Sequence, residues 1–309
     1  MDSAGTVRTV PTTYPRREER LNYRRPRWRR VVVVLVVLAA LAGGGSYAGY
    51  TIYERVETAL IVPGCQAGSG VNAQPLDPDQ APVGATIAGV AARMGLPARA
   101  LDIAYATALQ ESKLTNLPYG DLDSVGVFQQ RPSQGWGTAT QLEDPEYAST
   151  AFFSALVKVP NYLSLPEYVA AQDVQRSADG AAYEQWESTA QLLTTEYTAV
   201  AHGVTCWYTP AANTKANPAM AATGLAHVFG PTGAASDGAV LQGVNAGRSE
   251  LVVQVRPQDG WTVASWLMAN ASTYGLTKVS YDGWEWSASL RESSWQANPA
   301  HNAGSILAS

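Results

Sequence analysis

Between residues 83 and 203 the apolar positions recur with the spacing of helices, and Gly and Pro punctuate the pattern. No run here alternates apolar and polar residues, so we expect a mainly α domain over residues 83–208. Asp144 places a capping acceptor ahead of Pro145, and Ser164 with Glu167 has the spacing of a capping box. The predicted helices begin near residues 86, 97, 145, 165 and 182, and the last ends before Gly203.

The pattern changes after residue 208. Residues 251–255 (LVVQV) predict a strand, residues 261–274 a helix ended by Gly275, and residues 276–281 and 284–287 a hairpin that turns at Asp282 and Gly283. Residues 54–82 and 209–248 are rich in Gly, Pro and Ala and have linker compositions. We therefore predict a small α+β module over residues 249–309, joined to the helical domain by a linker.

The N-terminal end has a different composition. Residues 1–30 contain nine Arg against three acidic residues, and residues 31–53 carry no charge. Such a stretch is long enough to cross a hydrocarbon layer of roughly 30 Å as a helix. The positive arm would then stay in the cytoplasm. We predict a single-pass protein of the cytoplasmic membrane whose residues after the span are extracytoplasmic. The alternative is a cleaved signal peptide, because residues 40–42 have the small-x-small pattern of a cleavage site.

The two cysteines, Cys65 and Cys206, flank the helical region on the predicted exported side. An isolated pair in an oxidising compartment most often forms a disulfide, so we predict that these two residues are joined. Two Cys and three scattered His form no cluster with zinc-like spacing. We predict neither a metal site nor a cofactor.

Glu111 is the first residue for which the pattern predicts chemistry. Leu101, Ala104, Ala108 and Glu111 are spaced by three, four and three residues, which places them on one helix face. A carboxylate on an apolar face loses hydration, and near the end of a helix it also meets the negative end of the dipole. Both effects raise its pKa, as a general acid requires near neutral pH.

Four segments in a fixed order carry a resemblance to a known family. The segment ALQESKLTN around Glu111 is followed by DSVGVFQQRP, DPEYA and AAQDVQRSA. Together they resemble the soluble lytic transglycosylases and goose-type lysozymes, with a tighter resemblance to phage-tail and actinobacterial members of that group. The resemblance covers residues 83–203. It implies a lysozyme-like fold and cleavage of the glycan strands of peptidoglycan.

The resemblance also implies roles for single residues. Glu111 would be the general acid and base, and Ser112 would orient it. Family members carry a Tyr-Asn-x-Gly motif in a late helix, which is missing here, and two glutamines in the corresponding region are assigned to the sugar groove instead. The predicted substrate-binding residues are Ser112, Ser124, Gly126, Phe128, Gln129, Gln130, Gln172 and Gln175.

A second carboxylate would favour hydrolysis by two acids, and Asp121 and Asp123 are the nearby candidates. A purely structural role is at least as good an interpretation, because Asp is a common turn residue and both lie in the turn-like segment PYGDLDS. If neither serves, Glu111 alone would protonate the glycosidic oxygen. It would then act as base on the 6-hydroxyl of the sugar, which gives a 1,6-anhydro product.

We therefore predict a peptidoglycan-cleaving glycosidase, a lytic transglycosylase or muramidase, whose partners are the glycan strand and, through one span, the membrane. The alternative is a catalytically weak protein that binds peptidoglycan as a scaffold. Nucleic-acid binding is not expected, because the excess of positive charge is confined to the N-terminal arm. A transporter is not expected from a single span.

Overall fold

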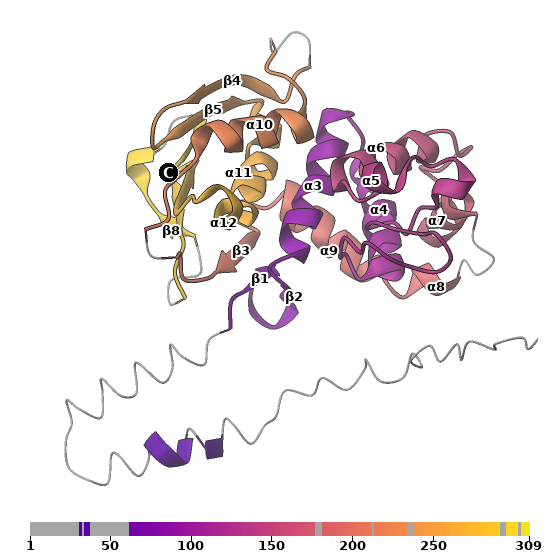
Figure 1. Cartoon of the computed structure of the whole chain (residues 1–309), viewed down its shortest axis with the longest axis horizontal. Coiled ribbons are helices and arrows are strands. Elements are labelled where there is room, and N and C mark those ends of the chain that lie inside the picture. Colours follow the sequence, from indigo (N-terminus) through magenta and orange to yellow (C-terminus); the bar gives the residue numbers. More distant parts are fainter. Residues whose placement is uncertain are drawn as a thin grey trace, which may run out of the picture. The chain divides into compact units, whose positions relative to one another are not determined.

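The computed structural model describes residues 31–32, 34–37, 62–176, 181–211, 213–233, 238–290, 295–301 and 304–309. Residues 1–61 and 62–309 form separate units, and the second is described below (Figure 1). The basic arm and most of the predicted span lie outside the described residues. Within the described ranges, no helix has both the length and the apolar character needed to cross a bilayer. This finding corrects the prediction of a single-pass membrane protein, which is not retained.

The helical part of the second unit is arranged around α4 (Ala98–Ser112). Residues 100–109 of α4 are buried except for Asp102, and the helix contacts α3, α6, α7, α8 and α9. Five alanines in α4 allow these neighbours to approach closely. The surrounding helices are α3 (Gln80–Arg93), α5 (Ala139–Leu142), α6 (Pro145–Leu156), α7 (Glu167–Gln175), α8 (Ala181–Glu184) and α9 (Glu187–Thr198), with short 3₁₀ turns η2 (Gly70–Asn72) and η3 (Pro132–Gln134).

A small antiparallel sheet joins the two ends of the helical part. Its order is β2-β1-β3, with β1 at Gly64–Ala67, β2 at Gln74–Leu76 and β3 at Val204–Trp207. Cys65 and Cys206 stand directly opposite each other in the β1–β3 register and form a disulfide. The predicted disulfide is confirmed. Strands β1 and β2 lie within residues 54–82, which composition had indicated as a linker.

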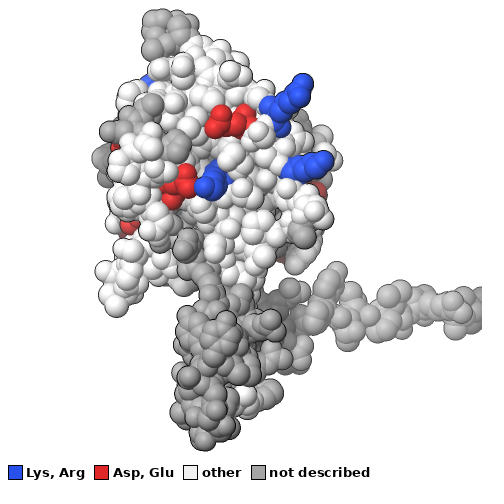
Figure 2. All heavy atoms as spheres, turned by 90° about the vertical axis from the view of Figure 1, so that its left-hand side faces the viewer, with Lys and Arg blue, Asp and Glu red and all other residues white. Residues whose placement is uncertain are grey.

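A larger antiparallel sheet of the order β4-β5-β9-β6-β7-β8 forms the C-terminal part (Figure 1). The face of the molecule on this side shows few charged side chains among its described residues (Figure 2). The predicted hairpin is present and turns at Asp282 and Gly283, both with positive φ. The elements are β4 (Leu241–Ala246), β5 (Leu251–Val255), η5 (Pro257–Asp259), α11 (Gly260–Ala269), α12 (Ala271–Tyr274), β6 (Lys278–Tyr281), β7 (Trp284–Ser287), β8 (Gln296–Ala297), η6 (Pro299–His301) and β9 (Ser305–Ala308).

The two parts share one packed interior. In α11 every residue except Trp261 is buried, and the helix contacts α3 and α9 as well as strands β6 and β9. The Trp266 indole N–H donates to Thr86 Oγ1 at 3.2 Å, and the Trp286 indole N–H donates to the Cys206 carbonyl at 2.9 Å. The C-terminal elements therefore stabilise the helical part directly.

The segment 209–248 differs from the predicted linker. It contains α10 (Pro218–Phe229), which contacts α3, and strand β4. Gly89 of α3 makes this close packing possible, because a Cβ there would lie 2.6 Å from Val228 Cγ1. Within the segment itself, Ala221 is fully buried and a Cβ at Gly224 would lie 2.7 Å from the Trp266 ring, so small residues that resemble a linker in composition here serve helix packing.

Two helix predictions also needed correction. The predicted capping box is wrong, because α7 begins at Glu167 and Ser164 Oγ donates to the Asn161 carbonyl. The Glu167 carboxylate instead pairs with Arg99 at 2.6 Å inside the fold. The helix predicted over 182–201 is divided into α8 and α9.

The expected fold class, a mainly α domain with a membrane helix, is wrong. Helices α3 to α9 do occupy the described part of residues 80–198, but two antiparallel sheets make this an α+β fold. The sheets were underestimated because β1, β2, β3, β8 and β9 are each only two to four residues long. Strands this short carry too few alternating positions to produce a sequence signal.

Candidate active site

Glu111 lies in the last turn of α4 and lines a pocket of about 220 Å³. Amides, one guanidinium and one indole form the rest of the wall, and such groups can hydrogen-bond hydroxyl and acetamido groups and stack on a sugar ring. Among the described residues, Glu111 is the only carboxyl in this lining. The other lining residues are Gln129, Gln130, Arg131, Gln134, Trp136 and Gln175.

α4 ends just after Glu111 because the chain turns into a left-handed conformation. Lys113 and Leu114 have φ values of 58° and 62°. Their N–H groups donate to the carbonyls of Leu109 and Ala108 at 3.2 and 3.0 Å, which closes the helix end. Leu114 is fully buried and anchors this turn. The Glu111 carboxyl is thereby held near the negative end of the helix dipole.

Burial raises the pKa of the Glu111 carboxyl above its usual value. Three neighbours act in the opposite direction: the side chains of Tyr183 and Gln175 hydrogen-bond to it, and the Lys113 ammonium favours its charged form. Loss of hydration outweighs these three effects. The carboxyl therefore holds its proton to a higher pH than an ordinary Glu does.

Tyr183 is a part of the site that the sequence did not reveal. Its hydroxyl donates to Glu111 Oε1 at 2.7 Å, and its ring, carried by α8, is buried. This contact fixes the orientation of the carboxyl as well as its charge. The two residues are 72 positions apart, and no motif around Tyr183 marks it.

Ser112 does not line the pocket but connects the end of α4 to the loop that does. Its Oγ lies 2.7 Å from the Val127 carbonyl and 3.1 Å from the Ala108 carbonyl, and it accepts the Thr115 N–H at 3.2 Å. Ser112 is buried. Its geometry suits a positioning residue rather than a sugar contact.

Three other predicted groove residues stabilise the loop between α4 and η3 by hydrogen bonding or packing. Ser124 Oγ donates to the Asp121 carbonyl at 2.5 Å. Gly126 has a φ of 78°, and a Cβ there would lie 2.1 Å from the Leu142 carbonyl oxygen, so glycine is required for backbone packing. Phe128 is buried and stacks on Phe152 with 4.5 Å between ring centroids. None of the three lines the pocket.

The predicted glutamines divide into two groups. Gln129, Gln130 and Gln175 line the pocket, whereas Gln172 does not. The Gln175 amide donates to the Phe128 carbonyl at 2.7 Å, which connects α7 to the loop. Gln129 donates to the Gly126 carbonyl at 3.0 Å. The pocket thus has a glutamine-rich wall contributed by two separate segments.

Asp121 and Asp123 do not reach the pocket. The Asp123 carboxylate accepts hydrogen bonds from Arg131 Nε at 2.8 Å and from the Ser133 N–H at 2.8 Å. The Arg131 guanidinium and this N–H lower the pKa of Asp123 to about 2. Asp123 is therefore ionised, and its carboxylate stabilises the loop through hydrogen bonds to Arg131 and Ser133.

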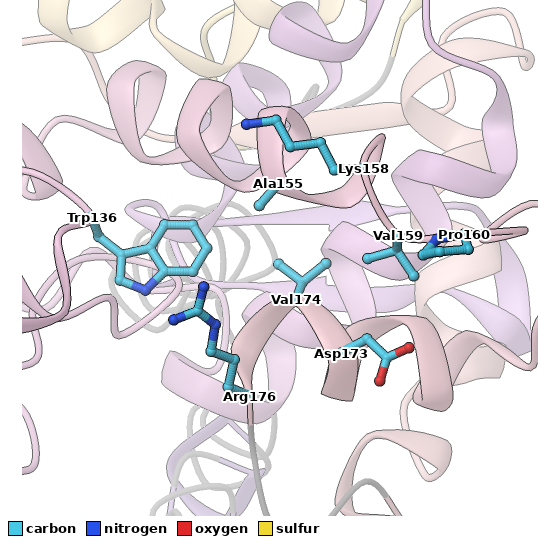
Figure 3. Close-up of a pocket in the computed structure, with 8 residues that line it drawn as sticks. All are labelled: Trp136, Ala155, Lys158, Val159, Pro160, Asp173, Val174 and Arg176. Atoms are coloured by element: carbon cyan, nitrogen blue, oxygen red, sulfur yellow. The ribbon is translucent and has the colours of Figure 1, made fainter.

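Trp136 borders a second, larger pocket of about 420 Å³ between the end of α6 and α7 (Figure 3). Trp136 lines both pockets, so they are neighbours. Tyr147 supports this loop, since its hydroxyl donates to the Trp136 carbonyl at 3.4 Å. The two pockets together offer an extended binding surface beside Glu111.

One group of potential metal ligands occurs among the described residues, at Asp144, Glu146 and His227. These side chains are engaged with one another and with Arg93: His227 Nε2 lies 2.8 Å from Asp144 Oδ2, and Arg93 lies 2.5 Å from Glu146 Oε1. A divalent cation would have to displace the guanidinium. None of these residues lines the Glu111 pocket.

Comparison with known protein families gave no match, and comparison with curated proteins gave none either.

Proposed function

We propose that this protein cleaves the glycan strands of peptidoglycan, with Glu111 as the general acid and then the general base. The observation that carries the proposal is a half-buried carboxyl with a raised pKa in a pocket walled by glutamines and an indole. Such a carboxyl holds a proton that it can deliver, and amides suit the hydroxyl and acetamido groups of amino sugars. The resemblance of four sequence segments to lytic transglycosylases supports the same reaction.

In the first step Glu111 gives its proton to the glycosidic oxygen, and the bond from that oxygen to the anomeric carbon breaks. The electron pair leaves with the oxygen, and the anomeric carbon becomes electron-deficient. In the second step the Glu111 carboxylate removes the proton of the 6-hydroxyl, whose oxygen then bonds to the anomeric carbon. Glu111 is again protonated, no water is consumed, and the product is a 1,6-anhydro sugar.

The state of the nearby carboxylates favours this single-acid route. Attack by water needs a second carboxylate to activate or replace that water. Asp123 is held by Arg131 and Ser133 outside the pocket, and Asp121 does not line it either. Tyr183 remains hydrogen-bonded to Glu111 and keeps the carboxyl oriented toward the pocket.

The test is digestion of purified peptidoglycan by the wild-type protein and by Glu111→Gln. The amide matches the carboxyl in size but cannot deliver a proton, so we expect the rate of fragment release to fall by roughly 10² to 10⁴. Asp121→Asn, a matched loss of one carboxylate outside the pocket, should keep most of the activity. Wild-type turnover in folded Glu111→Gln protein would remove Glu111 from the mechanism, and equal binding without cleavage in either form would favour a scaffold.

A further inference from the structure

The Lys and Arg side chains of the helical part differ in whether they have a partner. Between α3 and β3 the sequence has six Lys and Arg against thirteen Asp and Glu. Arg93, Arg99 and Arg131 are paired with carboxylates, at 2.5, 2.6 and 2.8 Å. Lys113 lies over the Trp186 ring, 4.2 Å from its centroid. The remaining two cations are Lys158 and Arg176.

Lys158 and Arg176 both line the pocket between α6 and α7. Neither forms an ion pair with any residue that the structure describes, although acidic residues outnumber basic ones in this part of the chain. Both side chains are exposed. With Asp173 as the one carboxyl in the described lining, Lys158 and Arg176 leave this pocket with a net charge of 2 − 1 = +1, which favours an anionic ligand.

The pocket shares one lining residue, Trp136, with the Glu111 pocket. Figure 3 shows the Arg176 guanidinium pointing toward the Trp136 indole, whereas the carboxyl of Asp173 points away from Arg176. Along α7, Gln175 lines the first pocket and Arg176 the second. A chain bound at Glu111 could therefore carry a side branch into the second pocket.

We propose that this second pocket binds an acidic peptide branch of the glycan strand, with Lys158 and Arg176 binding its carboxylates. The inference rests on the proposed function and names the substrate as peptide-bearing strands. Val159 and Val174 provide an apolar floor beside the two cations. A short acidic peptide offers several carboxylates together with small apolar side chains, whereas a peptide-free strand keeps only the lactyl carboxylate of each muramic acid and has no apolar side chains. A phosphate polymer would use the cations but not the floor.

The binding test uses the full-length Glu111→Gln protein, which leaves the probe uncleaved, and calorimetry. The two probes are a peptidoglycan disaccharide that carries its stem peptide and the same disaccharide without it. We expect the first to bind about tenfold more tightly, with a preference that weakens as salt is raised. Substituting Lys158→Gln and Arg176→Gln together should abolish the preference.

The control protein carries Lys215→Gln and Arg248→Gln, which remove one Lys and one Arg charge from exposed positions outside both pockets. It should keep the preference. Equal binding of the two probes, or a preference that survives the loss of Lys158 and Arg176, would overturn the inference. Displacement of the peptide-bearing probe by a glycerol phosphate polymer, but not by the free stem peptide, would also overturn it.

Cleavage separates this inference from the proposed function. Wild-type protein is incubated with intact strands and with strands stripped of their peptides by an amidase. A lower KM for intact strands supports the inference, and equal KM values refute it while the cleavage activity stands. If neither substrate is cut but the peptide preference persists in the binding test, the proposed function fails and the peptide site remains.

Discussion

At the scale of single residues, the site depends on a balance at one carboxyl. Burial raises the pKa of Glu111, and the Tyr183 hydroxyl at 2.7 Å partly offsets the effect by stabilising the charged form. Together with Gln175 and Lys113, Tyr183 therefore sets the pH range over which the Glu111 proton is available. The same hydroxyl fixes the position of the carboxyl.

Replacing Tyr183 by Phe should move this pH range upward. The hydrogen bond favours the carboxylate, so its loss raises the pKa of Glu111 further. The acid then keeps its proton to a higher pH, and the alkaline limb of the kcat profile shifts to higher pH. The check is a pH profile of wild type and Tyr183→Phe on the same substrate, with Tyr162→Phe as a control outside the pocket. An alkaline limb that stays in place or moves to lower pH would contradict this role.

The sequence predicted part of the site at this scale. Glu111 followed from helix spacing and motif, and Gln129, Gln130 and Gln175 do line the pocket. Tyr183 could not be predicted, because its contact with Glu111 spans 72 positions and depends on tertiary packing. Gly126 and Phe128 lie in the right segment but serve packing, which a motif cannot distinguish from ligand contact.

At the scale of elements, the small sheet and its disulfide close the helical part. β1 pairs with β3, and Cys65 joins Cys206 across 141 positions. Cross-linking so long a loop restricts the unfolded chain, which stabilises the folded state. The closure holds β1 beside α9 and β3 beside α11.

Substituting both cysteines by Ala should lower the free energy of unfolding by about 2 to 5 kcal/mol. Both residues change together, so no free thiol is left to form other disulfides. Urea unfolding of oxidised wild type and the double variant measures the difference. Reduced wild-type protein should match the variant, and equal stability of all three forms would show that the cross-link does not stabilise the fold.

Element predictions succeeded where local signals act alone. Asp144 accepts the Glu146 N–H at 3.0 Å and begins α6 as its sequence indicates. The capping box at Ser164 failed because the buried Glu167 carboxylate pairs with the partly exposed Arg99 and also accepts from Gln191 at 2.8 Å. Tertiary contacts here override the local signal.

At the scale of the whole molecule, residues 62–309 form one packed unit rather than two domains and a linker. Helices α10 and α11 both pack on α3. Gly89 lies at the contact with α10, and Thr86 accepts a hydrogen bond from the Trp266 indole of α11. Composition could not reveal this, because the small residues of a linker and of a tight helix interface are alike.

Gly89→Ala should therefore destabilise both parts of the unit together. The added Cβ would lie 2.6 Å from Val228 Cγ1 and 2.9 Å from Phe229 Cζ, and such overpacking costs about 1 to 3 kcal/mol. Hydrogen exchange measured by mass spectrometry should show an equal loss of protection in α4 and in β9. Gly304→Ala, where no atom lies within 4 Å of the added Cβ, is the matched control. Loss of protection confined to β9 would indicate two independent parts.

The central claim is that Glu111 alone cuts the glycan strand without water. It is tested most directly by mass spectrometry of the fragments that wild type and Glu111→Gln release from purified peptidoglycan in ¹⁸O-labelled water. We predict that wild type releases 1,6-anhydro muropeptides, lighter by one water than hydrolysis products and free of the label, and that Glu111→Gln releases almost none. Reducing-end fragments that carry ¹⁸O, or equal release by the two proteins, would contradict the account.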